Sequence, residues 1–128
     1  MVHFVNVKRL KKWKKISRKE RIRKIKDLIE IFKILGKKKV WIKRVNNLKE
    51  AADYMLNKVK DIKEENEIVI VDDNIYGKID VNLRSDDFIP ESREKFKELM
   101  IVADWIVGAY KDSVLKRLKN WKEFIVID

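Results

Sequence analysis

The stretch LMIVADWIVGAY, residues 99–110, is the longest apolar run of the chain. It is shorter than the ~20 apolar residues that a membrane-spanning helix needs, and Asp104 interrupts it. Apolar residues continue at helical spacing on both sides of it, which predicts one long last helix from about Glu91 to Lys119. Pro90 suits the first turn of such a helix. We therefore expect a C-terminal helix that packs on a protein core.

A second apolar segment, EIVIVD at residues 67–72, has a different pattern. Four consecutive branched apolar residues leave it without a solvent-facing side, which predicts a central strand covered on both faces. Shorter runs at residues 1–7, 39–45 and 124–128 are also typical of strands. The alternating segment at residues 78–84 fits either a half-buried strand or an extended loop.

Two further helices have recognisable start signals. Ser17 and Glu20 form a capping box, in which each side chain satisfies a free backbone N–H of the other residue. The box opens a helix whose apolar stripe runs to Leu35, and Gly36 is well placed as its C-terminal cap. Asn47 is expected to cap the next helix. The alternation of strands and helices predicts one α/β domain over residues 1–128 with a partly parallel sheet.

The composition limits the chemistry that the chain can offer. It has no cysteine and one histidine, His3, which excludes disulfides, thiolate metal sites and a His-rich metal site. Any metal would be held by carboxylates, and these favour Mg²⁺ or Mn²⁺ over zinc. No signal-peptide pattern is visible, and we expect a cytoplasmic protein. The abundance of Lys, Ile and Glu resembles thermophile usage, although genome base composition would produce it equally well.

Basic residues are concentrated near the N-terminus. Residues 1–45 carry 18 Lys and Arg against three acids, whereas residues 46–128 carry 14 against 18 acids. A domain with this asymmetry attracts polyanions, because each neutralised phosphate releases a condensed counterion. The candidate nucleic-acid-binding residues are Lys11, Lys12, Trp13, Lys14, Lys15, Arg18, Lys19, Arg21 and Arg23.

This basic segment has two interpretations. Trp13 lies among lysines, which suits phosphate contacts combined with base stacking. In the alternative, Trp13 and Ile16 anchor the segment to the core while the lysines are merely solvated. An ordinary solvated face mixes both signs of charge, so the scarcity of acids favours nucleic acid. A membrane surface is disfavoured, because the apolar stripe of this helix is needed for the core.

Asp104 is the single charge within residues 99–110. A buried carboxylate needs a partner or access to water, since an unpaired one is costly. One interpretation is a salt bridge to a lysine, or an apolar helix face narrower than expected. The other is a metal ligand that acts with Asp72 or Asp73, because ligands gather at strand ends in open α/β sheets.

The strand IVIVDD (residues 68–73) and the later helix IVADWIVGA (residues 101–109) together resemble one family. It is an uncharacterised RNase H-like family, widespread in prokaryotes and mobile elements, whose last helix carries an A-D-x-x-x-G-A motif. In the wider superfamily, strand and helix carboxylates hold divalent metal for phosphodiester cleavage. The resemblance implies a catalytic role for Asp72, Asp73 and Asp104, with Asp73 and Asp104 binding Mg²⁺ or Mn²⁺.

The chain departs from this family at two points. It lacks the initial β-hairpin, whose first strand ends in a catalytic aspartate followed by Glu-Ser-Gly, and Ile101-Val102 replace the usual glutamine before the Ala-Asp pair. Two-metal cleavage needs a complete carboxylate cluster around ions ~4 Å apart. The chain is therefore either a shortened, inactive relative, or a protein whose site another acid completes. Asp128, at the end of FIVID, is the candidate within this chain.

These observations predict a shortened RNase H-like sheet with packed helices and a long C-terminal helix. The expected function is binding of DNA or RNA, with a degenerate or partner-completed nuclease site. The alternative is a non-enzymatic module whose basic face docks an acidic protein. No membrane partner is expected. The edge strands left by the missing hairpin favour pairing into a homodimer.

Overall fold

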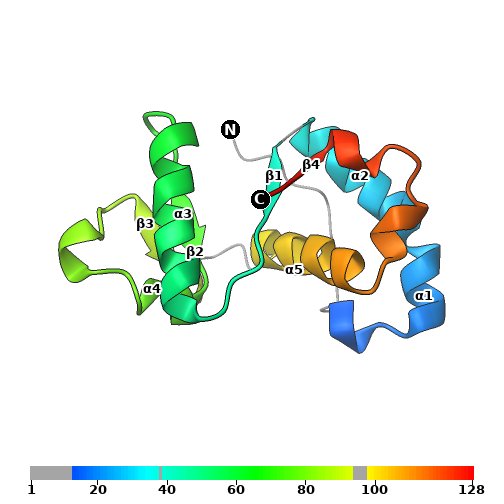
Figure 1. Cartoon of the computed structure of the whole chain (residues 1–128), viewed down its shortest axis with the longest axis horizontal. Coiled ribbons are helices and arrows are strands. Elements are labelled where there is room, and N and C mark those ends of the chain that lie inside the picture. The colour runs from blue at the N-terminus through cyan, green and yellow to red at the C-terminus, as the bar shows by residue number, and fades with distance from the viewer. Residues whose placement is uncertain (1–12, 38, 94–97) are drawn as a thin grey trace. The chain divides into compact units, whose positions relative to one another are not determined.

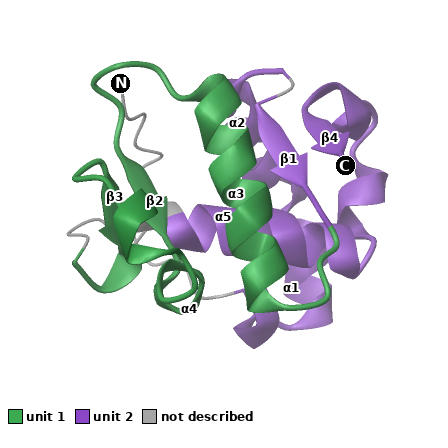
Figure 2. Cartoon of the chain, turned by 60° about the vertical axis from the view of Figure 1, so that its left-hand side comes forward, with its two compact units in different colours: residues 1, 44–97 green, residues 2–43, 98–128 purple. Residues whose placement is uncertain are grey.

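The computed structural model describes residues 13–37, 39–93 and 98–128 (Figure 1). The chain divides into two compact units (Figure 2). We call residues 44–97, with residue 1, the central unit, after their place in the sequence. Residues 2–43 and 98–128 form the terminal unit. The expected strand at residues 1–7 lies outside the described residues, and the prediction of a single domain over residues 1–128 stays a prediction.

The terminal unit is built from both ends of the chain. Its strands β1 and β4 pair in parallel, with Val40 opposite Ile125 and Ile42 opposite Ile127. This pairing confirms the expected parallel component. The helices and strands of the unit are α1 (Arg18–Arg23), α2 (Ile25–Leu35), β1 (Val40–Ile42), α5 (Glu98–Lys111) and β4 (Ile125–Ile127). Short 3-10 turns lie at Trp13–Lys15, Val114–Arg117 and Trp121–Glu123.

The predicted end signals of the first helix are present in the structure. Ser17 Oγ accepts a hydrogen bond from the backbone N–H of Glu20 at 3.3 Å. The expected single helix is divided at Lys24 into α1 and α2. Gly36 follows α2 with a φ of 87°, a conformation that glycine adopts without steric cost. Its N–H donates to the carbonyl of Phe32 at 2.9 Å, which confirms the predicted C-terminal cap.

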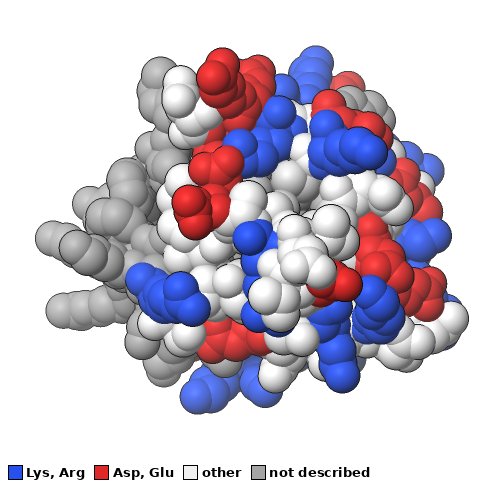
Figure 3. Space-filling view, turned by 90° about the vertical axis from the view of Figure 1, so that its left-hand side faces the viewer, with Lys and Arg blue, Asp and Glu red and all other residues white. Residues whose placement is uncertain are grey.

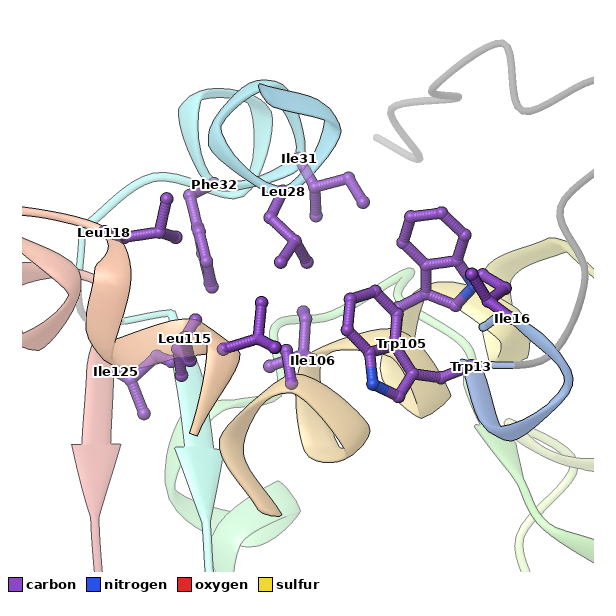
Figure 4. Close-up of a cluster of buried hydrophobic side chains, with 12 residues drawn as sticks. Trp13, Ile16, Leu28, Ile31, Phe32, Trp105, Ile106, Leu115, Leu118 and Ile125 are labelled. Carbon is purple, nitrogen blue, oxygen red and sulfur yellow. The ribbon is translucent and has the colours of Figure 1, made fainter. Parts of the chain in front are cut away.

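One apolar cluster forms the core of the terminal unit (Figure 4). Helix α2 contributes Leu28, Ile31 and Phe32, which face Ile106 of α5 and Leu115 of the turn after it. Strand β4 adds its first residue, and the turn before α1 adds an aromatic side chain. The other buried members of the cluster are Trp13, Ile16, Trp105, Ala109, Val114, Leu118 and Ile125.

A close contact joins the turn before α1 to helix α5. Trp13 is 3% exposed and its ring lies edge-on to that of Trp105, with the ring centroids 5.1 Å apart. Gly108 lies beneath it on α5, and a Cβ at Gly108 would stand 2.3 Å from Cδ1 of Trp13. Glycine is therefore needed at this position for close approach and not for backbone freedom.

The central unit has its own small core and a parallel strand pair. Strands β2 and β3 pair in parallel, with Val69 opposite Phe88 and Val71 opposite Pro90. Val71 is buried together with Ala52 and Ile79. The helices and strands of the unit are α3 (Leu48–Ile62), β2 (Val69–Val71), α4 (Asp73–Tyr76) and β3 (Phe88–Pro90), with 3-10 turns at Val81–Leu83 and Glu91–Arg93.

Helix α3 begins where the sequence predicts it. Asn47 Oδ1 accepts a hydrogen bond from the backbone N–H of Glu50 at 2.8 Å. The Glu50 carboxylate accepts from the backbone N–H of Asn46 at 3.1 Å. The predicted cap at Asn47 is thus confirmed. The helices and strands of the two units together confirm the α/β class.

The expected long helix from Glu91 to Lys119 is wrong. Pro90 ends strand β3, and α5 ends at Lys111. Ser113 then adopts a left-handed conformation with a φ of 67°, which an α-helix cannot continue through. Beyond it, Val114 and Leu115 lie in a 3-10 turn and Leu118 follows that turn, and all three side chains are buried. Apolar spacing alone does not distinguish such a turn from more helix.

Two other expectations need correction. Ile68 is 50% exposed, so the segment at residues 67–72 does have a solvent-facing side. Within the described residues β2 pairs with β3 alone, so it is an edge strand there and not the central strand that the sequence predicts. The segment at residues 78–84 is a loop with a 3-10 turn, which was one of its two interpretations. Across the described ranges, no helix has the length and apolar character needed to cross a bilayer.

Gly108→Ala tests the contact beneath Trp13. The added methyl group must displace a buried ring, so we expect the free energy of unfolding to fall by at least about 1–3 kcal/mol. Chemical denaturation followed by circular dichroism measures this. The matched control is Gly77→Ala, where the φ is −62° and the nearest atom would lie 3.6 Å from the new Cβ. That change should be neutral or slightly stabilising. Equal losses in both variants would contradict the packing argument.

Candidate nucleic-acid interface and carboxylate site

The exposed cations of the terminal unit form the first candidate site. Lys14 and Lys15 belong to the turn before α1, and Arg18, Lys19 and Arg23 belong to α1. All five are exposed. Within the described part of the chain, none of them forms an ion pair with a carboxylate. Lys11 and Lys12, also expected at this site, lie outside the described residues.

Trp13 does not share the exposure of its basic neighbours. Its backbone N–H donates to Asp104 Oδ2 at 2.9 Å, and its indole Nε1–H donates to Asp112 Oδ2 at 2.7 Å. Buried at 3% exposure, the ring offers no face to a nucleobase. The structure therefore supports the interpretation of Trp13 as an anchor to the core and corrects its assignment to the nucleic-acid interface.

Arg21 also contacts Trp13 and Asp112, and we call these contacts of Trp13 with Asp104, Asp112 and Arg21 the anchor. Its Nε donates to the carbonyl of Trp13 at 3.2 Å, and its Nη1 lies 3.4 Å from Asp112 Oδ2. The guanidinium carbon stands 6.0 Å from the centroid of the Trp13 ring, within range of a cation–π contact. With 21% of its side chain exposed, Arg21 is a positioning residue for the turn before α1.

Asp112 is the important residue that sequence reasoning missed. One of its oxygens accepts from Trp13 and Arg21, and the other accepts from the backbone N–H of Val114 at 3.1 Å. The Trp13 contact spans 99 positions of the sequence. No local pattern around Asp112 could indicate it, because the spacing within one helix carries no information about a partner so distant.

The two units differ strongly in charge. The terminal unit has 22 basic and 8 acidic side chains, a net charge of +14, whereas the central unit has 10 and 13, a net charge of −3. On the face of the central unit drawn in Figure 3, basic and acidic side chains are interspersed. The positive charge of the protein is therefore a property of the terminal unit.

Each of the three candidate catalytic aspartates accepts a hydrogen bond from a backbone N–H. Asp72 begins α4, and its Oδ1 accepts from the backbone N–H of Asn74 at 2.9 Å and of Ile75 at 3.3 Å. Asp73 Oδ1 accepts from the backbone N–H of Ser92 at 3.0 Å. These two residues belong to the central unit, and Asp104 belongs to the terminal unit. Each carboxylate thus has a structural role that requires no metal.

Asp104 is exposed and not buried. The apolar face of α5 is narrower than the sequence suggested, which was one of the interpretations left open. Its partner is the backbone N–H of Trp13 and not a lysine side chain. Asp128, the candidate for a completing acid, is exposed at the end of β4, where its N–H donates to the carbonyl of Ile42 at 2.9 Å.

The described residues contain no group of three or more His, Cys, Asp or Glu side chains that could hold a metal ion. The assignment of Asp73 and Asp104 as ligands of Mg²⁺ or Mn²⁺ therefore stays a prediction from the family resemblance. A cavity of about 860 Å³ lies in the central unit beside α3. Its charged lining consists of four acids, Asp53, Glu64, Glu65 and Asp87, and two lysines, Lys60 and Lys63, so it does not favour an anion such as phosphate.

Comparison of the chain with protein-family models, curated proteins and solved structures finds no match.

Substitution of Asp104 separates a structural role from metal binding. Asp104→Ala removes the acceptor for the Trp13 N–H, and we expect it to lower the free energy of unfolding by about 1 kcal/mol. Asp104→Asn keeps an acceptor oxygen and should restore most of this stability. A metal ligand would behave differently: Asn and Ala would both abolish the Mg²⁺ or Mn²⁺ affinity of the unsubstituted protein in calorimetric titration.

Asp112→Ala tests the anchor from its acceptor side. The change leaves the buried indole N–H of Trp13 without a partner, so we expect a loss of about 1–3 kcal/mol in the free energy of unfolding. The control is Asp53→Ala, which breaks only the exposed pair with Lys49 at 3.1 Å and should cost less than about 1 kcal/mol. Thermal or chemical denaturation of both variants decides the point, and a small loss for Asp112→Ala would refute the anchor.

Proposed function

We propose that this protein binds nucleic acid through the phosphate backbone, using the exposed cations of the turn before α1 and of α1 itself. The observation that carries the proposal is the set of exposed side chains at Lys14, Lys15, Arg18, Lys19 and Arg23, which form no ion pair with a described residue and belong to a unit of net charge +14. Phosphate contacts of this kind supply affinity without reading the base sequence.

The anchor at Trp13 strengthens this proposal. It ties the turn that carries Lys14 and Lys15 to Asp104 of helix α5 and to Asp112 just after that helix. The backbone beneath the lysines is therefore ordered before a ligand arrives, which reduces the entropy lost on binding. A merely solvated tail would lack such support.

Binding, and not cleavage, is the function that the described geometry favours. Asp72, Asp73 and Asp104 each hold a backbone N–H of the fold. The resemblance to the RNase H-like family supports the same class of partner, DNA or RNA, on the motifs at residues 68–73 and 101–109 alone. A degenerate or partner-completed nuclease is an outcome of the test below, as is docking of an acidic protein.

The test is the salt dependence of binding to fluorescent DNA duplex, single-stranded DNA and single-stranded RNA, measured by anisotropy. The triple variant Lys14→Ala, Lys19→Ala, Arg23→Ala removes three of the proposed phosphate contacts. Each contact with duplex contributes about −0.9 to the slope of log affinity against log salt, so the slope should become shallower by about 2 to 3.

The matched control is Lys60→Ala, Lys78→Ala, Lys116→Ala. These lysines are exposed, lie outside the proposed interface, and their loss changes the net charge equally. The control should retain the slope of the unsubstituted protein. Equal effects of the two triples, or no affinity for any of the probes, would overturn the proposal in favour of a protein partner. Strand scission with Mg²⁺ or Mn²⁺ that Asp104→Asn abolishes would establish the nuclease instead.

A further inference from the structure

A small apolar pocket opens on the terminal unit, away from the cations used above. Its volume is about 180 Å³. Ile29 and Phe32 of α2 form one wall, and Leu118, Trp121 and Phe124 form the other. Lys119 and Asn120 complete the lining. The pocket is much smaller than the roughly 300–1,000 Å³ of sites for drug-sized ligands, so it suits a single planar ring.

The aromatic walls of the pocket are held in place by the core. Phe124 is stacked on the buried Phe32, with the ring centroids 5.3 Å apart and the planes inclined by 23°. Trp121 packs against Tyr110, with the centroids 6.3 Å apart. A planar ring that enters therefore meets preformed aromatic surfaces, and little side-chain entropy is lost when it binds.

The surroundings of the pocket are cationic. Lys119 lines it, and Nζ of Lys122 stands 5.8 Å from the centroid of the Trp121 ring. Lys26 lies one helical turn before Ile29 on α2, and therefore on the same side of that helix. Lys26 and Lys119 are exposed and form no ion pair with a described residue.

Two nearby carboxylates have lysine partners. Glu30 pairs with Lys33 at 3.3 Å, and Glu123 pairs with Lys37 at 3.5 Å. Lys26 and Lys119 therefore add positive charge at the pocket mouth that no described carboxylate pairs with. An apolar slot with aromatic walls and a positive rim suits a ligand that joins a flat ring to negative charge.

We propose that this pocket accepts one unpaired base of a single-stranded nucleic acid, with Lys26 and Lys119 contacting the phosphates beside it. This inference rests on the proposed function and deepens it by naming the form of nucleic acid. A base within a duplex is paired and stacked, so its face cannot enter the pocket, whereas an unstacked base can. Stacking on aromatic side chains tolerates every base, so the preference is for single strands and not for a sequence.

Two isoleucines on α2 provide a matched pair of variants. Ile29 lines the pocket and is 38% exposed, whereas Ile34 is 37% exposed and does not line it. Ile29→Glu and Ile34→Glu thus add the same charge to equally exposed positions of the same helix. The probes are fluorescent oligothymidylate, fluorescent oligouridylate and a DNA duplex of equal length. Circular dichroism and thermal unfolding establish that both variants fold.

We expect the unsubstituted protein to bind the single strands more tightly than the duplex. Ile29→Glu should weaken single-strand binding by at least roughly fivefold more than Ile34→Glu does, because base–aromatic stacking is worth about 1–3 kcal/mol. The two variants should bind duplex equally. As a second test, Trp121→Ala should lose the single-strand preference and Trp121→Phe, which retains an aromatic face, should keep it.

The failures of the two proposals are distinguishable. If the unsubstituted protein binds neither single strands nor duplex, the proposed function itself fails. If it binds both, but Ile29→Glu and Ile34→Glu weaken single-strand binding equally, only the pocket inference is overturned. Loss of the preference in Trp121→Phe as well as in Trp121→Ala would also overturn it.

Discussion

The insertion of Trp13 beside Gly108 is the contact on which the terminal unit depends. Glycine provides the space, Asp104 accepts the backbone N–H, and Asp112 accepts the indole N–H. Arg21 closes the arrangement by contacting both Trp13 and Asp112. Through this contact, a strongly basic part of the chain becomes part of a folded core, although like charges along it repel one another. Polar groups of Trp13 that would be costly to bury unpaired are all satisfied.

This constraint divides the charged residues into two groups with different roles. Charges that hold the anchor, such as Arg21 and Asp112, are largely shielded from solvent. The cations next to them in the sequence, Lys14, Lys15 and Lys19, point into solvent and have no carboxylate partner among the described residues. The second group is free to meet phosphates because the first group supports the backbone that carries it. The small aromatic pocket between α2 and the C-terminal turns is the surface that we propose for a base.

Several features of the fold were predictable from neighbouring residues alone. Ser17 and Asn47 cap their helices because an oxygen acceptor two or three positions from a free N–H needs no distant partner. Gly36 ends α2 for a similarly local reason. The prediction of a long last helix was wrong because the backbone of Ser113 leaves the helical conformation while the helical spacing of apolar residues continues. The strand at residues 69–71 is present, but its expected covering on both faces was wrong, because four branched residues in a row do not show whether Ile68 has a covering element.

For the candidate sites, the distribution of Lys and Arg along the sequence was sufficient to locate the positive charge. The composition, with no Cys and one His, left carboxylates as the expected ligands of any metal. The sequence left two interpretations of Trp13 open, a residue that stacks on a base or an anchor to the core. Packing chose between them, because the contact of Trp13 with Asp112 spans 99 positions and depends on how α5 meets the turn before α1. The same packing engages Arg21 with Trp13 and Asp112, leaves Asp104 exposed and forms the pocket at Trp121. A helix cap depends on a few adjacent residues, and the net charge is a sum over the sequence, so both can be determined without the fold. Burial of a side chain depends on distant partners that only the folded chain brings together.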